Sequence, residues 1–251
     1  MKVLRPILVL AGLVAFWQLI VIVTDAQPYL LPGPGLVVLA WIDNVDILFG
    51  HAALTAAEMI LGLIVGVTLG GASALFMAYF RPARAWLLPV LVISQAIPVF
   101  ALAPLLVLWL GYGMVSKIAM AALIIFFPVA SAFNDGLRRT EPGWLDLART
   151  MNASRWSILR HVRIPAALPS LASGLRVASA VAPIGAVVGE WVGSSAGLGY
   201  LMLQANGRMQ IDVMFAALVT LAALAIALFF TVDRLSRLLI PWQPETPASH
   251  D

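Results

Sequence analysis

The sequence predicts an all-α, polytopic membrane protein with about six transmembrane helices. Of its 251 residues, 62% are hydrophobic and only 11% are charged, and a soluble domain of this length cannot bury so much apolar surface. Six apolar runs are long enough to cross a bilayer core of about 30 Å as helices. Helices are expected because they satisfy their own backbone hydrogen bonds in lipid. The predicted spans lie near residues 6–24, 54–80, 86–110, 116–133, 166–190 and 213–232.

The first apolar run has some features of a signal peptide, because Lys2 and Arg5 stand at its start. The sequence at 24–26 is a poor small-x-small cleavage site, however, and five more apolar runs follow. We therefore expect an uncleaved first span. The chain is predicted to be one transmembrane domain over 1–251, with core spans within 54–232, a cytoplasmic loop at 134–165 and a polar tail at 241–251.

Two other segments call for irregular structure. The third run contains Pro89, Pro98 and Pro104, which should kink or break its helix. In the loop between the first two spans, Leu-Pro-Gly-Pro-Gly (31–35) predicts a turn, and Leu36–Phe49 is expected to form a short helix at the membrane interface.

The distribution of basic residues predicts the orientation. Cytoplasmic loops of membrane proteins carry an excess of arginine and lysine. With the N-terminus inside, Lys117 and Arg208 are the basic residues of the outer side, and Arg176 lies within the fifth span. The inner side then holds Lys2, Arg5, Arg81, Arg84, Arg138, Arg139, Arg149, Arg155, Arg160, Arg163, Arg234 and Arg237. Both termini are therefore predicted to be cytoplasmic, and this asymmetry explains the net charge of +3 better than nucleic-acid binding does.

Several kinds of chemistry are disfavoured. The chain has no cysteine, and its three histidines, His51, His161 and His250, are all predicted outside the spans and show no metal-ligand spacing. A P-loop needs Gly-Lys-Ser/Thr, and neither Lys2 nor Lys117 follows a glycine. We expect no catalytic residue, no metal and no cofactor in this chain, and an intramembrane enzyme is disfavoured.

A basic segment interrupts the apolar sequence. Residues 146–165 carry four arginines, which would cost roughly 2.5–3.5 kcal/mol each in a membrane span, so the segment must lie in the cytoplasm. Pro142 suits a helix start, Asn152 tolerates a left-handed bend, and Ser154 can cap a second helix that Pro165 ends or joins to the fifth span. On physical grounds two interpretations stay open: a loop on lipid headgroups or a docking element for a partner protein.

Small residues recur every fourth position in two spans. The stripe of the second span is Gly62, Gly66, Gly70, Ala74 and Ala78, and that of the fifth is Gly174, Ala178, Ala182 and Ala186. Such stripes let helix backbones approach closely in lipid, so we interpret them as packing surfaces rather than as a pore lining.

Polar groups in the spans are candidate pathway residues. Gln95 and Pro98 lie in the interrupted third span, where a broken helix can border a cavity. Arg176 is too deep to reach the surface easily and is expected to pair with an acid or with carbonyl groups. Glu58 and Glu190 lie near the outer ends of their spans, where simple hydration is the alternative to a functional role, and Glu190 is kept as a pathway candidate.

The basic segment resembles the cytoplasmic signature of ABC-importer permeases, E-A-A-x-x-x-G followed by L-P. Asp146 stands for the acid, Leu147 and Ala148 for the alanines, and Asn152 for the glycine, with Ala153 beside it. Ile164 and Pro165 match the final pair. The departures are Asp for Glu, Leu for Ala and Asn for Gly. The runs SQAIPVFALAPLLVLWLGYG (94–113), FFP (126–128) and GLGYLM (197–202) are similar to permeases of the nitrate, sulfonate and pyrimidine type.

The resemblance implies a division of labour. In that family the segment that matches this signature forms a coupling helix, which inserts into a groove on an ATP-binding cassette subunit. It also implies a periplasmic or lipid-anchored substrate-binding protein, a second permease copy in a homodimer, and a bacterial inner-membrane location. The implied substrate is a small molecule, with a thiamine-precursor pyrimidine such as hydroxymethylpyrimidine ranked before sulfonate or taurine, nitrate and riboflavin. A passive channel or an ion-coupled carrier is the alternative class, although no inverted repeat supports a carrier.

Overall fold

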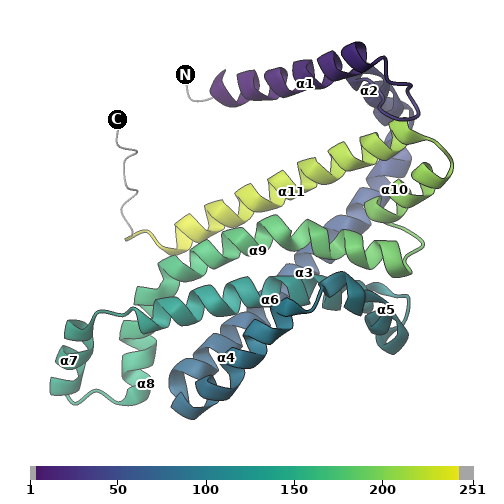
Figure 1. Ribbon diagram of the computed structural model, residues 1–251. Coiled ribbons are helices and arrows are strands. Elements are labelled where there is room, and N and C mark those ends of the chain that lie inside the picture. The colour runs from purple at the N-terminus through teal and green to yellow at the C-terminus, as the bar shows by residue number, and fades with distance from the viewer. Residues whose placement is uncertain (1–3, 243–251) are drawn as a thin grey trace.

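The computed structural model describes residues 4–242 and shows helices joined by short turns (Figure 1). Elements α1 to α6 are Leu4–Thr24, Pro34–Asp43, Val45–Tyr79, Arg81–Ala96, Val99–Leu110 and Met114–Arg138. The following elements are α7 (Pro142–Thr150), α8 (Arg155–Ile158), a short π-helix η1 (Leu159–Arg163), α9 (Ile164–Gly193), α10 (Leu198–Gly207) and α11 (Ile211–Leu239). The all-α prediction is confirmed for these residues.

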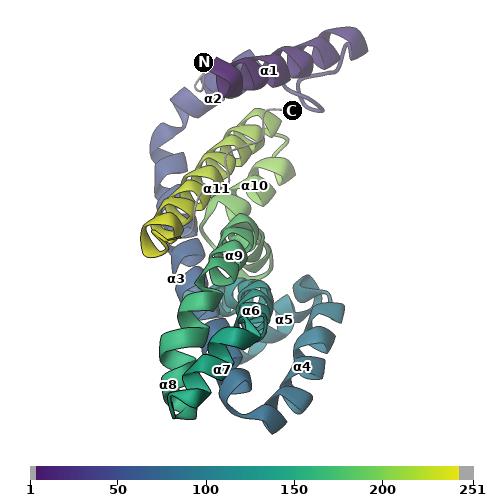
Figure 2. The ribbon, with the colours of Figure 1, turned by 90° about the vertical axis from the view of Figure 1, so that its left-hand side faces the viewer.

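Helix α6 forms the centre of the bundle and packs against both α3 and α9 (Figures 1 and 2). The buried residues Ala121, Ile125 and Val129 of α6 form one apolar cluster with Ala178 and Ala182 of α9. Two side chains of α3, Leu63 and Val67, pack against the same cluster. The three helices therefore share one core.

The predicted small-residue stripes form these contacts. A Cβ added to Gly62 would lie 2.4 Å from Ala121 Cβ, and one added to Gly70 would lie 2.8 Å from the carbonyl oxygen of Phe126. On α9, a Cβ at Gly174 would lie 2.7 Å from Ala132 Cβ. Real side chains do not tolerate such distances, so glycine is what allows the backbones of α3 and α9 to approach α6. The packing interpretation of both stripes is confirmed.

The third predicted span is broken, as its prolines suggested. Helices α4 and α5 meet at a bend of 100° after Ala96, and Pro98 precedes the first residue of α5. Pro89 and Pro104 lie inside α4 and α5 without ending them. Among the described residues, five helices are long and apolar enough to cross a membrane, and the bent pair makes a sixth candidate span. This agrees with the predicted number.

Several boundaries differ from the prediction. Helix α3 begins at Val45 rather than near 54, so the expected interfacial helix 36–49 is divided into α2 and the first turn of α3. Helix α6 continues to Arg138, because Gly136 and Leu137 are buried beyond the predicted end at 133. The predicted loop 134–165 therefore begins later. Helix α10 was not predicted, since its ten residues are too short to give a span signal.

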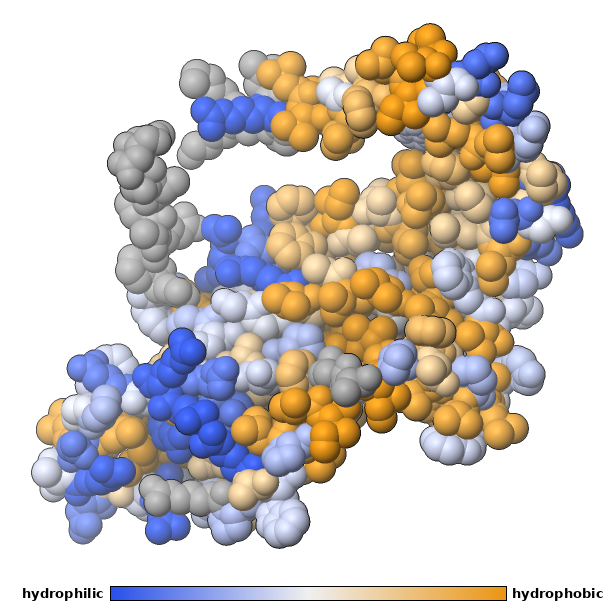
Figure 3. Space-filling model, viewed as in Figure 1, coloured by the Kyte–Doolittle hydropathy of each residue, from blue (hydrophilic) through white to orange (hydrophobic). Residues whose placement is uncertain are grey.

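The surface of the bundle suits lipid. Apolar side chains cover a broad band between two hydrophilic regions, one around α7 and α8 and one at the opposite end of the molecule (Figure 3). Helix α1 lies apart from the central helices in both ribbon views, and residues 7–24 are unburied (Figures 1 and 2). It contacts α11 through Trp17, which stacks on Phe215 at 5.6 Å. The exposed apolar faces are those expected of helices in a hydrocarbon solvent.

We expect Gly185→Ala to disrupt the bundle. Its Cβ would lie 2.5 Å from the Cα of Ala121, a backbone atom that cannot move without shifting α6, and overpacking of this kind costs about 1–3 kcal/mol or more. Gly71→Ala is the matched control, because a Cβ at Gly71 meets no atom within 4 Å. Thermal unfolding of the two variants in detergent would separate them. Equal melting temperatures would contradict the close-packing account.

Candidate functional site

The site predicted from the basic segment is the helical excursion α7–α8–η1. Pro142 lies in the first turn of α7, where its missing N–H costs no hydrogen bond. Ala148 is buried, whereas Trp144, Leu147 and Met151 are 52%, 62% and 74% exposed. These three residues recur at helical spacing, so α7 presents an apolar stripe outward. An exposed apolar stripe on a short helix is typical of a surface that a partner covers.

Asn152 ends α7 with the bend that the sequence predicted. Its φ is +58°, in the left-handed region. Its N–H donates to the Arg149 carbonyl at 2.9 Å, and the N–H of Ala153 donates to the Ala148 carbonyl at 3.0 Å. This pair of bonds is a Schellman motif, in which glycine is the commonest residue at the left-handed position and asparagine is also found. The motif turns the chain sharply from α7 into α8.

The second half of the excursion continues into the membrane helix. Ser154 caps α8 by accepting a hydrogen bond from the N–H of Ser157 at 3.2 Å, as predicted. Pro165 has no N–H to donate to the carbonyl four residues before it, and the preceding turn widens into η1. The helix then runs on into α9, so Pro165 joins the excursion to the fifth span rather than ending it.

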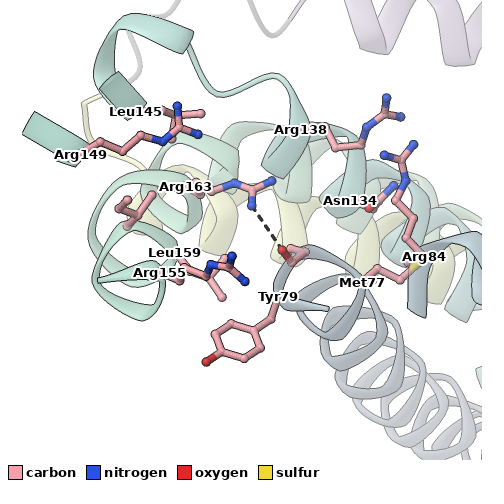
Figure 4. A pocket seen from close by; sticks show the side chains of 12 residues that line it. Met77, Tyr79, Arg84, Asn134, Arg138, Leu145, Arg149, Arg155, Leu159 and Arg163 are labelled. Carbon is pink, nitrogen blue, oxygen red and sulfur yellow. Dashed lines mark hydrogen bonds between the residues drawn. The ribbon is translucent and has the colours of Figure 1, made fainter. Parts of the chain in front are cut away.

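Two side chains of η1 fix the excursion to the bundle, and neither was predicted to do so. Leu159 is 3% exposed and packs with Ala74, Phe133 and Leu137. Arg163 donates through Nε and Nη2 to the Leu137 carbonyl, at 3.0 and 2.7 Å. Its Nη1 donates to the Ala78 carbonyl at 3.3 Å, shown by the dashed line in Figure 4. Arg163 thus caps the C-terminal ends of α3 and α6 together, where a cation also complements the helix dipoles.

The remaining predicted coupling residues lie on this excursion. Asp146 pairs with Arg149 at 2.8 Å, and both side chains are mostly exposed, so the pair adds little stability. Leu147, Asn152 and Ala153 lie on α7 and its bend. The structure brings Asp146 through Ala153 together at one surface, and it places Ile164 and Pro165 where η1 enters α9.

Two pathway candidates lie at the broken third span. Pro98 is exposed beside the bend between α4 and α5. Gln95 lies in the last turn of α4, and its side chain falls outside the part of the chain that the structure describes. Both therefore stay predictions as pathway residues.

Arg176 has the acidic partner that its depth led us to expect. Its Nε lies 2.6 Å from Asp233 Oδ1 on α11, and Asp233 Oδ2 accepts from Arg237 Nε at 3.0 Å. The pair joins α9 to α11. This geometry favours structural pairing over substrate contact.

The alternative that Glu58 and Glu190 are simply hydrated is excluded. Their exposures are 0% and 1%, because α3 and α9 turn both carboxylates into the bundle. Glu58 Oε1 lies 2.9 Å from Lys117 Nζ, and Lys117 is itself only 5% exposed, although the sequence placed it on the outer surface. A buried charge needs a counter-charge, and each residue of this pair supplies it for the other.

Glu190 organises the N-terminal end of α10. Its Oε2 accepts from the N–H groups of Gly199 and Tyr200 at 2.5 and 3.3 Å, and its Oε1 accepts from Thr55 Oγ1 at 2.6 Å. Thr55 in turn accepts from the N–H of Leu198 at 2.8 Å. The first N–H groups of any helix lack partners within it, so Glu190 and Thr55 satisfy those of α10. Glu190 acts here as a helix-capping group.

Gly197 and His51 also form part of the structure at the N-terminal end of α10. Gly197 has φ +111°, and a Cβ there would lie 2.2 Å from the Glu190 carboxyl carbon, so a side chain is excluded by both conformation and space. Its N–H donates to His51 Nδ1 at 2.8 Å. The sequence analysis placed His51 outside the predicted spans, but it lies within α3, which begins earlier than predicted. His250 falls outside the described residues.

Residues 62–243 match the family described as the inner membrane component of binding-protein-dependent transport systems. The chain belongs to this family. A probable ABC transporter permease protein of Haemophilus influenzae is 53% identical over 92% of this chain and 95% of its own length.

More distant relatives carry substrate names. A formylaminopyrimidine transport permease protein of Halalkalibacterium halodurans is 36% identical over 96% of this chain and 97% of its own. A riboflavin transport system permease protein of Chloroflexus aurantiacus is also 36% identical, over 92% and 87%. The fold is similar to that of the inward-facing MetNI methionine ABC transporter, with a TM-score of 0.59, 23% identity, and 78% and 95% of the two chains covered.

Membership settles the general role of the chain. It is a multi-pass inner-membrane permease subunit of an ABC importer, and it is not an enzyme, because ATP hydrolysis lies in a separate subunit. Permeases of this family work with ATP-binding subunits and substrate-binding proteins. A carrier or channel that works without ATP is thereby excluded as the primary function.

The buried pair in this permease makes a double-mutant prediction. Lys117→Met leaves the Glu58 carboxylate buried without its cation, which we expect to destabilise the protein by about 3–5 kcal/mol. Adding Glu58→Gln removes the unpaired charge and should restore a large part of the loss. Thermal unfolding of the two single variants and the double variant in detergent measures this. A double variant no more stable than Lys117→Met would show that the pair does not act as described.

Proposed function

We propose that the excursion α7–α8–η1 is the element through which an ATP-binding subunit drives this permease. The observation that carries the proposal is the outward apolar stripe of α7, which is held at a fixed angle by the bend at Asn152. Ala148 lies on the buried side of α7, and the contacts of Leu159 and Arg163 hold the following turn against α3 and α6. A force applied to α7 is then transmitted to the core helices as a rigid-body movement rather than absorbed by a flexible loop.

The orientation we propose places this excursion in the cytoplasm, together with both chain termini. The start of α1, the C-terminal end of α11 and the α7–α8 excursion lie toward the same end of the molecule in Figure 1, and α10 lies toward the other. Arg5, Arg234 and Arg237 belong to these first two elements, so the basic residues gather at one end, as the positive-inside rule requires of a cytoplasmic face.

We further propose that two copies of this single permease domain form one substrate pathway, which opens alternately to the two sides. Gln95 and Pro98, at the break between α4 and α5, are the positions we propose for lining it, since interrupted helices expose backbone where they border a cavity. Arg176 and Glu190 we now assign to positioning α9 against α11 and α10, because their charged groups are engaged there.

The substrate we propose is a small, neutral, flat solute, best represented by a hydroxymethylpyrimidine-like thiamine precursor. The relative named as a formylaminopyrimidine permease supports this choice, and the riboflavin permease at equal identity keeps a larger flat solute as the second candidate. Arg176, the cation that the sequence places deep in a span, is balanced by Asp233. This favours a neutral solute over sulfonate, taurine or nitrate, which need several donors or a positive field.

Variants of the bend test the coupling role. Asn152→Pro forbids a φ of +58° and removes the N–H that donates to Arg149, so it should abolish substrate-stimulated ATP hydrolysis without preventing membrane insertion. Asp146→Lys, which reverses a charge beside the stripe, should weaken the response. Asn152→Gly is the matched control and should retain activity, because glycine adopts this conformation freely. The measurement is ATPase stimulation in the reconstituted complex. Wild-type stimulation by Asn152→Pro would refute coupling through α7.

Uptake competition tests the substrate. Cells that depend on this system should accumulate labelled hydroxymethylpyrimidine, and unlabelled pyrimidine should compete where taurine and nitrate do not. Riboflavin is included as a competitor to rank the second candidate, and cells carrying Asn152→Pro give the baseline. Uptake blocked by taurine but indifferent to pyrimidine would overturn the substrate and leave the importer role intact.

A further inference from the structure

A cavity of about 690 Å³ lies between the α7–α8–η1 excursion and the neighbouring ends of α3, α4 and α6 (Figure 4). Its lining is unusually basic, because α4, α6, α7, α8 and η1 each contribute one arginine side chain. Of the described residues that line it, none is acidic. The five arginines are Arg84, Arg138, Arg149, Arg155 and Arg163. We call this the arginine cavity.

The arginines of the cavity differ in how they are engaged. Arg163 is held by the carbonyls of Leu137 and Ala78, and Arg149 pairs with Asp146. Among the described residues, Arg84, Arg138 and Arg155 have no hydrogen-bond or ion-pair partner. Figure 4 shows the guanidinium groups of Arg84 and Arg138 close together on one side of the cavity, with Arg155 across from them.

Such an arrangement is suited to an oxyanion. Like charges that converge without a counter-charge repel one another, and an anion between them removes that repulsion. The planar guanidinium matches phosphate oxygens with paired hydrogen bonds, which is why arginine is favoured for recognising phosphate. Three arginines from three helices can therefore bind one phosphate group together, and more strongly than any one of them would.

The aromatic residues beside the cavity indicate where that phosphate comes from. Tyr79 lines the cavity, and its ring contacts Trp156 at 6.1 Å and Phe80 at 4.9 Å between centroids. Phe76 continues the cluster at 5.0 Å from Phe80, and all four side chains are well exposed. They lie where the apolar helix α3 ends, and aromatic side chains at the ends of a span mark the depth of the lipid headgroups.

We propose that the arginine cavity binds the phosphate group of an anionic membrane lipid. The ligand bridges Arg84 of α4, Arg138 of α6 and Arg155 of α8, and it holds the coupling excursion against the bundle. The lipid acts as a structural ligand of the transporter and is not its cargo. The site is independent of the solute that is imported.

The experiment uses the purified transporter and three probes, which are phosphatidylglycerol, phosphatidylcholine and inorganic phosphate. Binding is measured by native mass spectrometry and by the shift in melting temperature. The test variant is Arg84→Gln/Arg138→Gln/Arg155→Gln, which breaks no hydrogen bond or ion pair among the described residues. The control, Arg139→Gln/Arg160→Gln/Arg234→Gln, removes the same number of charges from exposed positions outside the cavity.

We expect phosphatidylglycerol to bind in preference to phosphatidylcholine, and the test variant to bind it about tenfold more weakly while the control changes little. Equal losses in the two variants would overturn the proposal in favour of general surface electrostatics. No preference for phosphatidylglycerol in the wild-type protein would also overturn it. Stabilisation by inorganic phosphate without any by phosphatidylglycerol would overturn the lipid as the source and assign the cavity to a soluble anion.

Discussion

The close approach of α3 and α9 to α6 is the constraint on which the rest of the permease depends. Lipid provides no hydrophobic drive for helices to associate, so the bundle must gain its stability from contact between surfaces that fit. Glycine at positions such as 62, 70, 174 and 185 brings backbone against backbone or against alanine. The three helices therefore behave as one body, and the other elements are positioned relative to it.

Hydrogen bonds attach a further element to each end of that core. At one end Arg163 caps α3 and α6 together and secures the coupling excursion. At the other, Glu190 and Thr55 satisfy the backbone of α10 and secure the Gly-Leu-Gly-Tyr segment. Both sets of hydrogen bonds satisfy backbone groups at helix ends, which would otherwise lack partners. Such groups are costly to leave unsatisfied away from water. A rigid core that is attached to the excursion at one end and to α10 at the other can transmit a movement of α7 along its whole length.

The broken third span packs on this rigid unit from one flank. Helix α5 contacts α6 and α9, whereas α4 packs against α3 and buries Leu91 beside Met77 and Ala130. The bend of 100° after Ala96 exposes backbone that an unbroken helix would hide. The arginine cavity lies between this flank and the coupling excursion, so the same region holds both the proposed pathway residues and the proposed lipid site.

Local signals in the sequence determined the membrane-spanning helices, the break at Pro98, the stripes of small residues and the left-handed bend at Asn152, because each depends on residues within a few positions of one another. The sequence also identified Arg176 as needing a partner, but not Asp233 as that partner. Only the tertiary structure showed that Glu58, Lys117 and Glu190 are buried, that η1 fastens the excursion, and that arginines from α4, α6 and α8 converge. Glu190 meets Thr55 across 135 residues of chain, and such contacts depend on how each helix is rotated about its axis. Packing decides that rotation, and nothing local in the sequence encodes it.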